Sequence, residues 1–411
     1  MNDWPKEKRQ DVSIKIILFL ISPFFASLYS LRRIKTKSSY LIFFLTFGFF
    51  GMAFSVISGR DGSGGYGIDG EFYRSSFERF QYVTNWEFVE GFKEFLSFDE
   101  GKKDYYFETV AFYVSRFTDN YHLMFMVVAI IFAFFALKSF RFLIAEEKLD
   151  ASLSSYILIY LFTFNQIFNI NGVRFWTAAW IAVFCVFQIY RNGNKWYLLL
   201  ALLTPYFHGT YWFFIGVLAI VHIFKRFDRI WVVLFFISFL MSTLAVELIQ
   251  YFQSYLPTFL SKTVDSYTNT DYIEQRQTWS GFGWLAVMFE NFVKIYLNIM
   301  VLLFIKHSDE IKANTKIKDL YSFLLIWMTV FNFLMFVPSL GNRYIILAYP
   351  VIAYIWLVHF KDVKYTFILF LLPIVFFWKI IEQIRYYLAV TSYDFYFSNP
   401  LLLIYNYILA Y

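Results

Sequence analysis

Long apolar runs recur along the whole chain and are separated by short polar stretches. The runs fall near residues 14–31, 39–58, 121–143, 152–170, 174–190, 195–224, 230–250, 283–305, 320–338, 344–360 and 363–382. A bilayer core of about 30 Å requires about 20 apolar residues of a helix. The runs are continuous, whereas the strands of a membrane barrel alternate apolar and polar positions. The pattern therefore predicts an all-α, polytopic transmembrane bundle of about 10 to 12 helices.

Composition agrees with this interpretation and narrows the chemistry. The 411 residues are 59% hydrophobic and 24% aromatic, which excludes an ordinary water-soluble domain. The single cysteine, Cys185, excludes an internal disulfide and any CxxC motif. The net charge of +6 is spread over short loops, so nucleic acid is not an expected partner. We expect residues 1–411 to form a single integral membrane domain.

Lysine and arginine are concentrated in alternate loops. Six short loops hold 18 of these residues, near 31–38, 138–150, 191–195, 225–229, 306–319 and 361–364. Because short cytoplasmic loops are enriched in Lys and Arg, we expect all six in the cytoplasm. The short loops on the other side hold only Arg174 and Arg343.

Two longer polar segments are then expected on the outer side. Residues 59–120 form a large extracytoplasmic loop with twelve acidic and seven basic side chains, and residues 251–282 form a second one. Within the first loop, apolar residues recur every three or four positions near 86–96 and 107–117. This spacing predicts amphipathic helices that lie on the membrane surface.

The apolar run 195–224 is interrupted near its middle. It begins and ends at predicted cytoplasmic loops, yet about 30 residues are too few for two full spans at 1.5 Å per residue. The interruption TPYFHG at residues 204–209 contains the helix breakers Pro205 and Gly209. We expect two short or re-entrant helices, with the tip near His208 pointing outward.

Several ionisable residues therefore gather at helix ends on the outer face, namely Arg60, Asp69, Arg174, His208, Arg276 and Arg343. Each has an alternative explanation: Arg174 and Arg343 could snorkel to the interface, and His208 could be a packed, hydrogen-bonded histidine. Ordinary solvated loop charges are the alternative for the other two arginines. If functional, two or three arginines beside a histidine suit a lipid-attached pyrophosphate, because guanidinium donors match phosphate oxygens two at a time.

Other familiar motifs are missing from the sequence. The glycine-rich piece at residues 62–67 lacks the GK[ST] ending of a phosphate-binding loop. The five histidines show neither HExxH nor another zinc-ligand spacing. We therefore expect no metal and no cofactor.

The motifs around these residues resemble a known family. The piece NGVRFWTAAW (171–180), followed by Phe207-His208, resembles the "RQ…A…FH" core of EpsG-like and Wzy-type polysaccharide polymerases. Asp69 with Tyr73 looks like the family's D..Y motif, and the GNRY piece at 341–344 resembles its later arginine. One departure is Phe175, which stands where glutamine commonly follows the arginine.

The resemblance implies a GT-C-like, metal-independent, inverting glycosyltransferase of the bacterial cytoplasmic membrane. Such a polymerase of O-antigen, capsule or exopolysaccharide transfers undecaprenyl-pyrophosphate-linked oligosaccharide repeat units onto another repeat unit at the outer or periplasmic face. The implied partners are this lipid-linked oligosaccharide and membrane lipid, with a chain-length regulator as a further candidate. Two alternatives stay open: a lipid-linked-sugar flippase or other transporter, and another membrane glycosyl- or acyltransferase.

The resemblance also suggests roles for individual residues. Arg174 and Arg343 would hold the leaving pyrophosphate and stabilise its developing charge. His208 would add to that cradle or take the proton from the acceptor hydroxyl, and Asp69 is the alternative base. The expected substrate-binding residues are Arg60, Tyr73 and Arg276.

Overall fold

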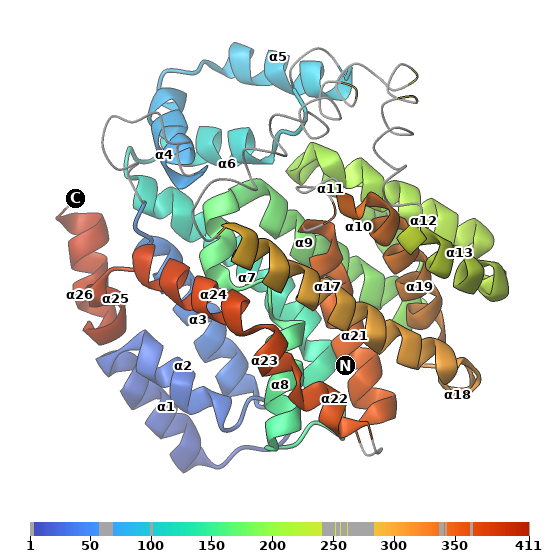
Figure 1. Ribbon diagram of the computed structural model, residues 1–411. Helices are drawn as coiled ribbons and strands as arrows, with labels where there is room; N and C mark the ends of the chain where they lie inside the picture. Colours follow the sequence, from blue (N-terminus) through green and yellow to red (C-terminus); the bar gives the residue numbers. More distant parts are fainter. Residues whose placement is uncertain are drawn as a thin grey trace.

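The computed structural model describes residues 4–56, 69–98, 102–240, 283–336, 343–361 and 365–410, with residues 251, 255, 261 and 341. Within these ranges the chain is helical apart from its connections, with an isolated bridge between Phe54 and Thr391 and no strand. The predicted all-α membrane fold is confirmed (Figure 1).

The helices follow the apolar runs closely, with more interruptions than expected. The first half of the chain forms α1 (Arg9–Ile21), α2 (Pro23–Leu31), α3 (Lys37–Met52), α4 (Asp69–Phe80), α5 (Asn85–Leu96), α6 (Tyr106–Ser115), α7 (Tyr121–Ile144), α8 (Leu153–Phe162), η1 (Ile167–Gly172), α9 (Val173–Val186) and η2 (Phe187–Arg191). The middle forms α10 (Tyr197–Ala201), α11 (Thr204–Phe207), η3 (Gly209–Tyr211), α12 (Trp212–Phe224), α13 (Asp228–Leu240), α17 (Gly283–Lys306), α18 (Ser308–Ala313), α19 (Lys318–Phe333) and η4 (Leu334–Phe336). The last part forms η5 (Ile345–Leu347), α21 (Ala348–Ile355), η6 (Trp356–Phe360), α22 (Thr366–Phe370), α23 (Leu372–Val375), α24 (Phe377–Ala389), α25 (Tyr393–Phe397), α26 (Pro400–Ile404) and η7 (Tyr405–Leu409).

Proline explains the first difference from the expected spans. The run 14–31 is two helices, because the chain leaves the helix at Ser22 and Pro23 begins α2. Proline suits the first turn of a helix, where its missing N–H is not needed. The Ser22 hydroxyl accepts a hydrogen bond from the Phe25 N–H and so caps the new helix.

Three helical runs of the described chain are long and apolar enough to cross a membrane: Tyr121–Ile144, Leu153–Arg191 and Val287–Lys306. A fourth candidate is the pair Thr366–Val375 and Phe377–Ala389, which is bent by 51°. The second run doubles back at η1, because Arg191 at its end is 2.8 Å from Glu146, which precedes its start. It therefore corresponds to the two expected segments 152–170 and 174–190.

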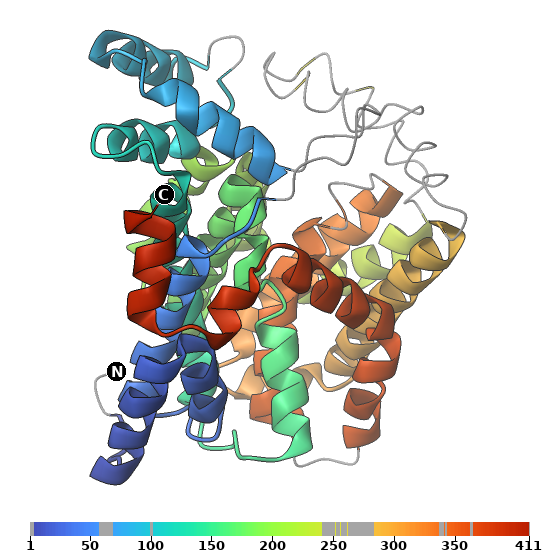
Figure 2. The same ribbon diagram turned by 90° about the vertical axis from the view of Figure 1, so that its left-hand side faces the viewer.

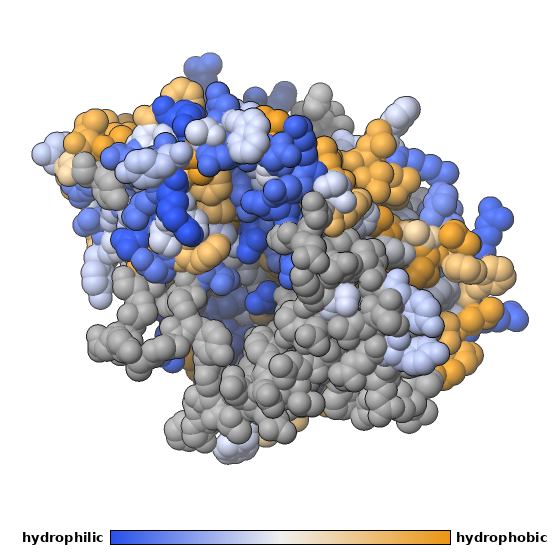
Figure 3. All heavy atoms as spheres, turned by 90° about the horizontal axis from the view of Figure 1, so that it is seen from above, coloured by the Kyte–Doolittle hydropathy of each residue, from blue (hydrophilic) through white to orange (hydrophobic). Residues whose placement is uncertain are grey.

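The two ends of the molecule differ in chemistry. The six basic loops meet at one end, the basic end, where ion pairs and a hydrogen bond join them. Arg191 and Lys316 both pair with Glu146, and Lys35 donates to the Glu146 carbonyl. The other ion pairs there are Lys361–Asp150, Lys225–Asp319 and Lys312–Asp228. Helices α4, α5 and α6 form the opposite end (Figures 1 and 2). Viewed from that end, many of the described side chains that reach the surface are hydrophilic (Figure 3).

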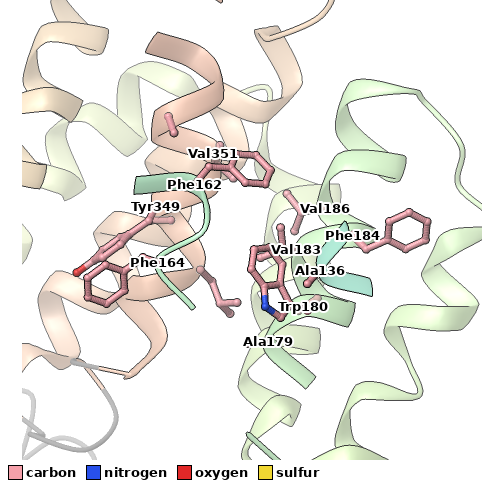
Figure 4. Close-up of a cluster of buried hydrophobic side chains, with 14 of the residues drawn as sticks. Ala136, Phe162, Phe164, Ala179, Trp180, Val183, Phe184, Val186, Tyr349 and Val351 are labelled. Carbon is pink, nitrogen blue, oxygen red and sulfur yellow. The ribbon is translucent and has the colours of Figure 1, made fainter. Parts of the chain in front are cut away.

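The core lies where α7, α8, α9 and α21 meet. Trp180 of α9 is 2% exposed and stacks against Phe162 of α8, and its indole N–H donates to the Asn165 carbonyl. Tyr349 and Val351 of α21 complete the cluster (Figure 4). This packing fixes the beginning of α9, and the candidate site is built around that helix end.

Candidate functional site

Arg174 is held at the start of α9 by two partners from distant parts of the chain. Its Nε donates to the Tyr73 hydroxyl at 3.0 Å, and its Nη1 donates to Asp104 Oδ1 at 2.9 Å. Its Nη2 makes no hydrogen bond to the described part of the chain, and the side chain is 32% exposed. The guanidinium is therefore fixed in orientation while one edge stays open to a ligand.

Asp104 is a site residue that the sequence analysis missed. Its Oδ1 accepts from Arg174, and its Oδ2 accepts the Gly209 N–H at 3.3 Å, so one carboxylate joins α9 to the 208–211 turn. Burial raises the pKa of Asp104, and the Arg174 charge and the hydrogen bonds act against that shift. The partners lie 70 and 105 positions away, and no local pattern marks such a pair.

Asp69 and Tyr73 lie one turn apart on α4, a helix that was not expected within the 59–120 loop. Helix α4 begins against the η1 turn, where the Gly70 N–H donates to Asn171 Oδ1 at 3.0 Å. A Cβ added to Gly172 would be 3.8 Å from Asp69 Oδ2, so the Asp69 carboxylate lies beside the start of α9. Burial raises the pKa of the Tyr73 phenol, and the neutral phenol accepts the Arg174 N–H.

His208 and Arg343 both contact the Phe175 ring. The His208 ring is edge-on to Phe175 at 5.3 Å, and the Arg343 guanidinium lies 5.6 Å from the same ring centroid. The His208 Nδ1 accepts the Thr210 N–H at 3.4 Å, which leaves the proton of the neutral imidazole on Nε2. The Thr210 hydroxyl is in turn hydrogen-bonded to the Tyr344 hydroxyl. The helix break expected near His208 is present between α11 and η3.

Arg343 also lines a cavity of about 360 Å³ that several other charged side chains share. Asn169 and Trp176, on either side of Arg174 in sequence, also line it. The lining further includes the charged residues Glu290 and Lys294 of α17 and Lys379 and Glu382 of α24. Arg343 makes no ion pair or hydrogen bond with any residue that the structure describes. Its charge is therefore available to an anion that enters the cavity.

A second carboxyl group near Arg174 was also missed. Glu108 on α6 has a buried Oε2 that finds no hydrogen-bond partner in the described ranges. Burial raises its pKa, and the nearby Asp104 raises it further.

Arg60 and Arg276, two of the expected substrate-binding residues, lie outside the described residues, as does the glycine-rich piece 62–67. The structure thus brings together Asp69, Tyr73, Arg174, His208 and Arg343.

The fold and the site define a class: a helical membrane protein in which Arg174, His208 and Arg343 gather near the start of α9, with Arg343 also lining a cavity between the helices. The model of the EpsG family matches residues 62–395, so the chain belongs to the EpsG family. The match confirms the resemblance that the arginine and histidine motifs indicated. No curated protein and no solved structure matches the chain.

Proposed function

We propose that this EpsG family member is a bacterial surface polysaccharide polymerase that transfers undecaprenyl-pyrophosphate-linked repeat units with inversion and without a metal. Family membership makes it a membrane protein of the polysaccharide-polymerase type, whose substrate is a lipid-linked oligosaccharide. The finer assignment rests on one observation: Arg174 has an open donor edge, and Arg343, which has no ion pair with a described residue, contacts the ring of the next residue, Phe175. We place the reaction at the outer face of the cytoplasmic membrane.

The two arginines suit a diphosphate that must leave with additional negative charge. Each guanidinium presents paired N–H donors, and a low-dielectric site strengthens their attraction to phosphate oxygens. The His208 Nε2–H is a further donor, because Nδ1 already accepts the Thr210 N–H. This geometry favours His208 as part of the diphosphate cradle over His208 as the base.

Asp69 is the proposed base. Both oxygens of Asp104 are engaged, by Arg174 and Gly209, whereas Asp69 is exposed beside the start of α9. In the reaction the bond from the anomeric carbon to the diphosphate breaks, and its electron pair leaves with the phosphate oxygen. The acceptor hydroxyl bonds to the opposite face of that carbon, and its proton passes to Asp69.

Arg343→Ala is the sharpest test, because it removes a charge without leaving a described carboxylate unpaired. We expect purified Arg343→Ala, supplied with lipid-linked repeat units, to form polymer on the order of 10²- to 10³-fold more slowly than wild type. Arg174→Lys should also be slow, because an ammonium lacks the bidentate fork. The matched control is Arg79→Ala, since Arg79 on α4 is exposed and donates only to Ser76 within the described residues.

The readout also separates the alternatives. Long polymer at the wild-type rate from Arg343→Ala would contradict the proposed role of the arginine. If wild-type protein moved lipid-linked units across a vesicle membrane without lengthening them, the chain would be a flippase. Chain length on gels and leaflet accessibility of the labelled units are the two measurements.

A further inference from the structure

A group of metal-binding side chains lies at the basic end of the molecule. His307 ends the α17 region, Glu310 lies on α18, and His359 lies on η6, 52 residues after His307. His307 Nδ1 is 3.2 Å from Glu310 Oε1, and His359 Nε2 is 3.2 Å from Glu310 Oε2. One ligand atom from each of the three lies within 4.8 Å of the others. Sequence spacing gave no sign of this group, because it forms only when the two helix ends meet.

We propose that His307, Glu310 and His359 bind a divalent transition metal, with zinc as the ion that fits best. Two imidazoles and one carboxylate are a known zinc ligand set, with bonds of about 2.0–2.2 Å. Tetrahedral bonds of that length place ligand atoms about 3.3 Å apart. Each histidine lies 3.2 Å from a different oxygen of Glu310, and one ligand atom from each of the three residues lies within 4.8 Å of the others. Side-chain rotations that bring these three atoms closer together would close the site around an ion.

A neighbouring tyrosine favours coordination through His307 Nδ1. The Tyr365 hydroxyl is 3.3 Å from His307 Nε2, on the side of the ring away from Glu310. With Nδ1 bound to the metal, Nε2 carries the proton and donates it to the Tyr365 oxygen. Hydrogen bonds of this kind fix the tautomer and orientation of a metal-bound histidine. Tyr365 is thus a positioning residue for the site.

The exposure of the three side chains leaves room for a water ligand. The two histidines are each 19% exposed, whereas Glu310 is 64% exposed. Zinc held by three protein ligands takes water or another ligand in its fourth position. Arg343 and His359 stand at opposite ends of the helical run 345–360, about 24 Å apart at 1.5 Å per residue. The metal would therefore join α17 and α18 to η6 and not take part in sugar transfer.

Zinc binding to the purified full-length protein tests the proposal. The protein should have an affinity tag without histidine and should first be treated with a chelator. Isothermal titration with ZnCl2 is expected to show one site per chain, and the unfolding temperature should rise as zinc is added. Calcium, which prefers oxygen ligands, should have no effect.

Variants assign the ligands. His307→Ala and His359→Ala should lose the site, and Tyr365→Phe should bind on the order of 10- to 100-fold more weakly. If an alanine variant fails to fold, Glu310→Gln tests the site instead, because glutamine has nearly the shape of glutamate but no carboxylate. His222→Ala, an exposed histidine on α12, should bind zinc like wild type. The proposal would be overturned if wild type bound no zinc, or if both His307→Ala and His359→Ala bound zinc as well as wild type. This outcome does not depend on the result for Arg343→Ala, which tests the proposed polymerase activity.

Discussion

Phe175 shows how a single residue can organise the candidate site without supplying a polar group. It follows Arg174 directly, it is 5% exposed, and its ring contacts both His208 and Arg343. An aromatic face attracts a guanidinium, and its edge-on contact fixes the plane of a histidine ring. At the position where the family motif commonly has glutamine, this chain thus orients two side chains of the candidate site by packing.

Phe175→Leu is expected to weaken binding of the lipid-linked donor. Leucine keeps most of the buried volume but has no aromatic face, and a cation–π contact contributes about 0.5–2 kcal/mol. The apparent affinity for the donor should fall by about 2- to 30-fold, with the protein still folded. The measurement is the dependence of polymer formation on donor concentration. Phe184→Leu, in the core of the same helix, is the control, and equal effects of the two variants would contradict a special role for Phe175.

At the scale of helices, the sequence predicted continuous apolar segments well and helices held by distant contacts poorly. The run 121–143 is α7, and the periodic stretches near 86–96 and 107–117 are α5 and α6. Helix α4 was missed because its buried positions, which include Tyr73 and Phe77, are few and separated by charged residues. The C-terminal helices beyond residue 382 were also missed, because they are short and lack one long apolar run.

The site was predictable in its cations but not in the groups that position them. Arg174 and His208 stood out because charges and helix breakers interrupt apolar sequence. Asp104 lies in a polar stretch where an acidic residue is unremarkable, and only the folded chain brings it to Arg174. The proposed metal-binding group has the same origin, since the His307 and His359 rings meet where the end of α17 lies beside the 345–360 run. Contacts between distant segments have no local pattern that a single sequence can reveal.

The crossing of α3 and α7 depends on a glycine. A Cβ added to Gly51 would lie 2.4 Å from Ala129 Cβ and 2.6 Å from the Phe125 carbonyl oxygen. Gly51→Ala would therefore force the helices apart and should lower the free energy of unfolding by about 1–3 kcal/mol. Gly216→Ala on α12 meets nothing within 4 Å, so it should be neutral or stabilising. Thermal unfolding of the two variants in detergent is the measurement, and equal unfolding temperatures would contradict the predicted clash.

Across the whole molecule, the proposed transfer site and the ion pairs of the basic end lie apart from each other. The first is built from α4, α9, the 208–211 turn and Arg343. The second is centred on Glu146, whose carboxylate accepts from Arg191 at 2.8 Å, from Lys316 at 2.8 Å and from Tyr354 at 2.7 Å. Glu146 thus joins the end of α7 to η2, to the loop before α19 and to α21. Because α9 and α21 run between the two ends, this carboxylate helps to hold the helices that position Arg174 and Arg343.

Glu146→Gln is expected to destabilise the fold in a pH-dependent way. Burial raises the pKa of Glu146, but the hydrogen bonds from Lys316, Tyr354 and Arg191 outweigh it and hold the pKa below its usual 4.5. The carboxylate therefore contributes stability that is present above about pH 4.5 and is lost as the pH falls through the lowered pKa. At pH 7 the variant should be less stable by about 3 kcal/mol, because Arg191 loses its counter-charge in a buried position.

The comparison of wild type, Glu146→Gln and Glu147→Gln by thermal unfolding from pH 7 down to about pH 3 checks this prediction. The gap between wild type and Glu146→Gln should stay constant above about pH 4.5 and narrow below it, while Glu147→Gln, which changes an exposed neighbour, should show no such gap. A gap that stayed constant over this range would show that the lost charge is not the cause. Since Glu146 lies at the other end of the helices that bear Arg174 and Arg343, the variant should make polymer at the wild-type rate per folded molecule.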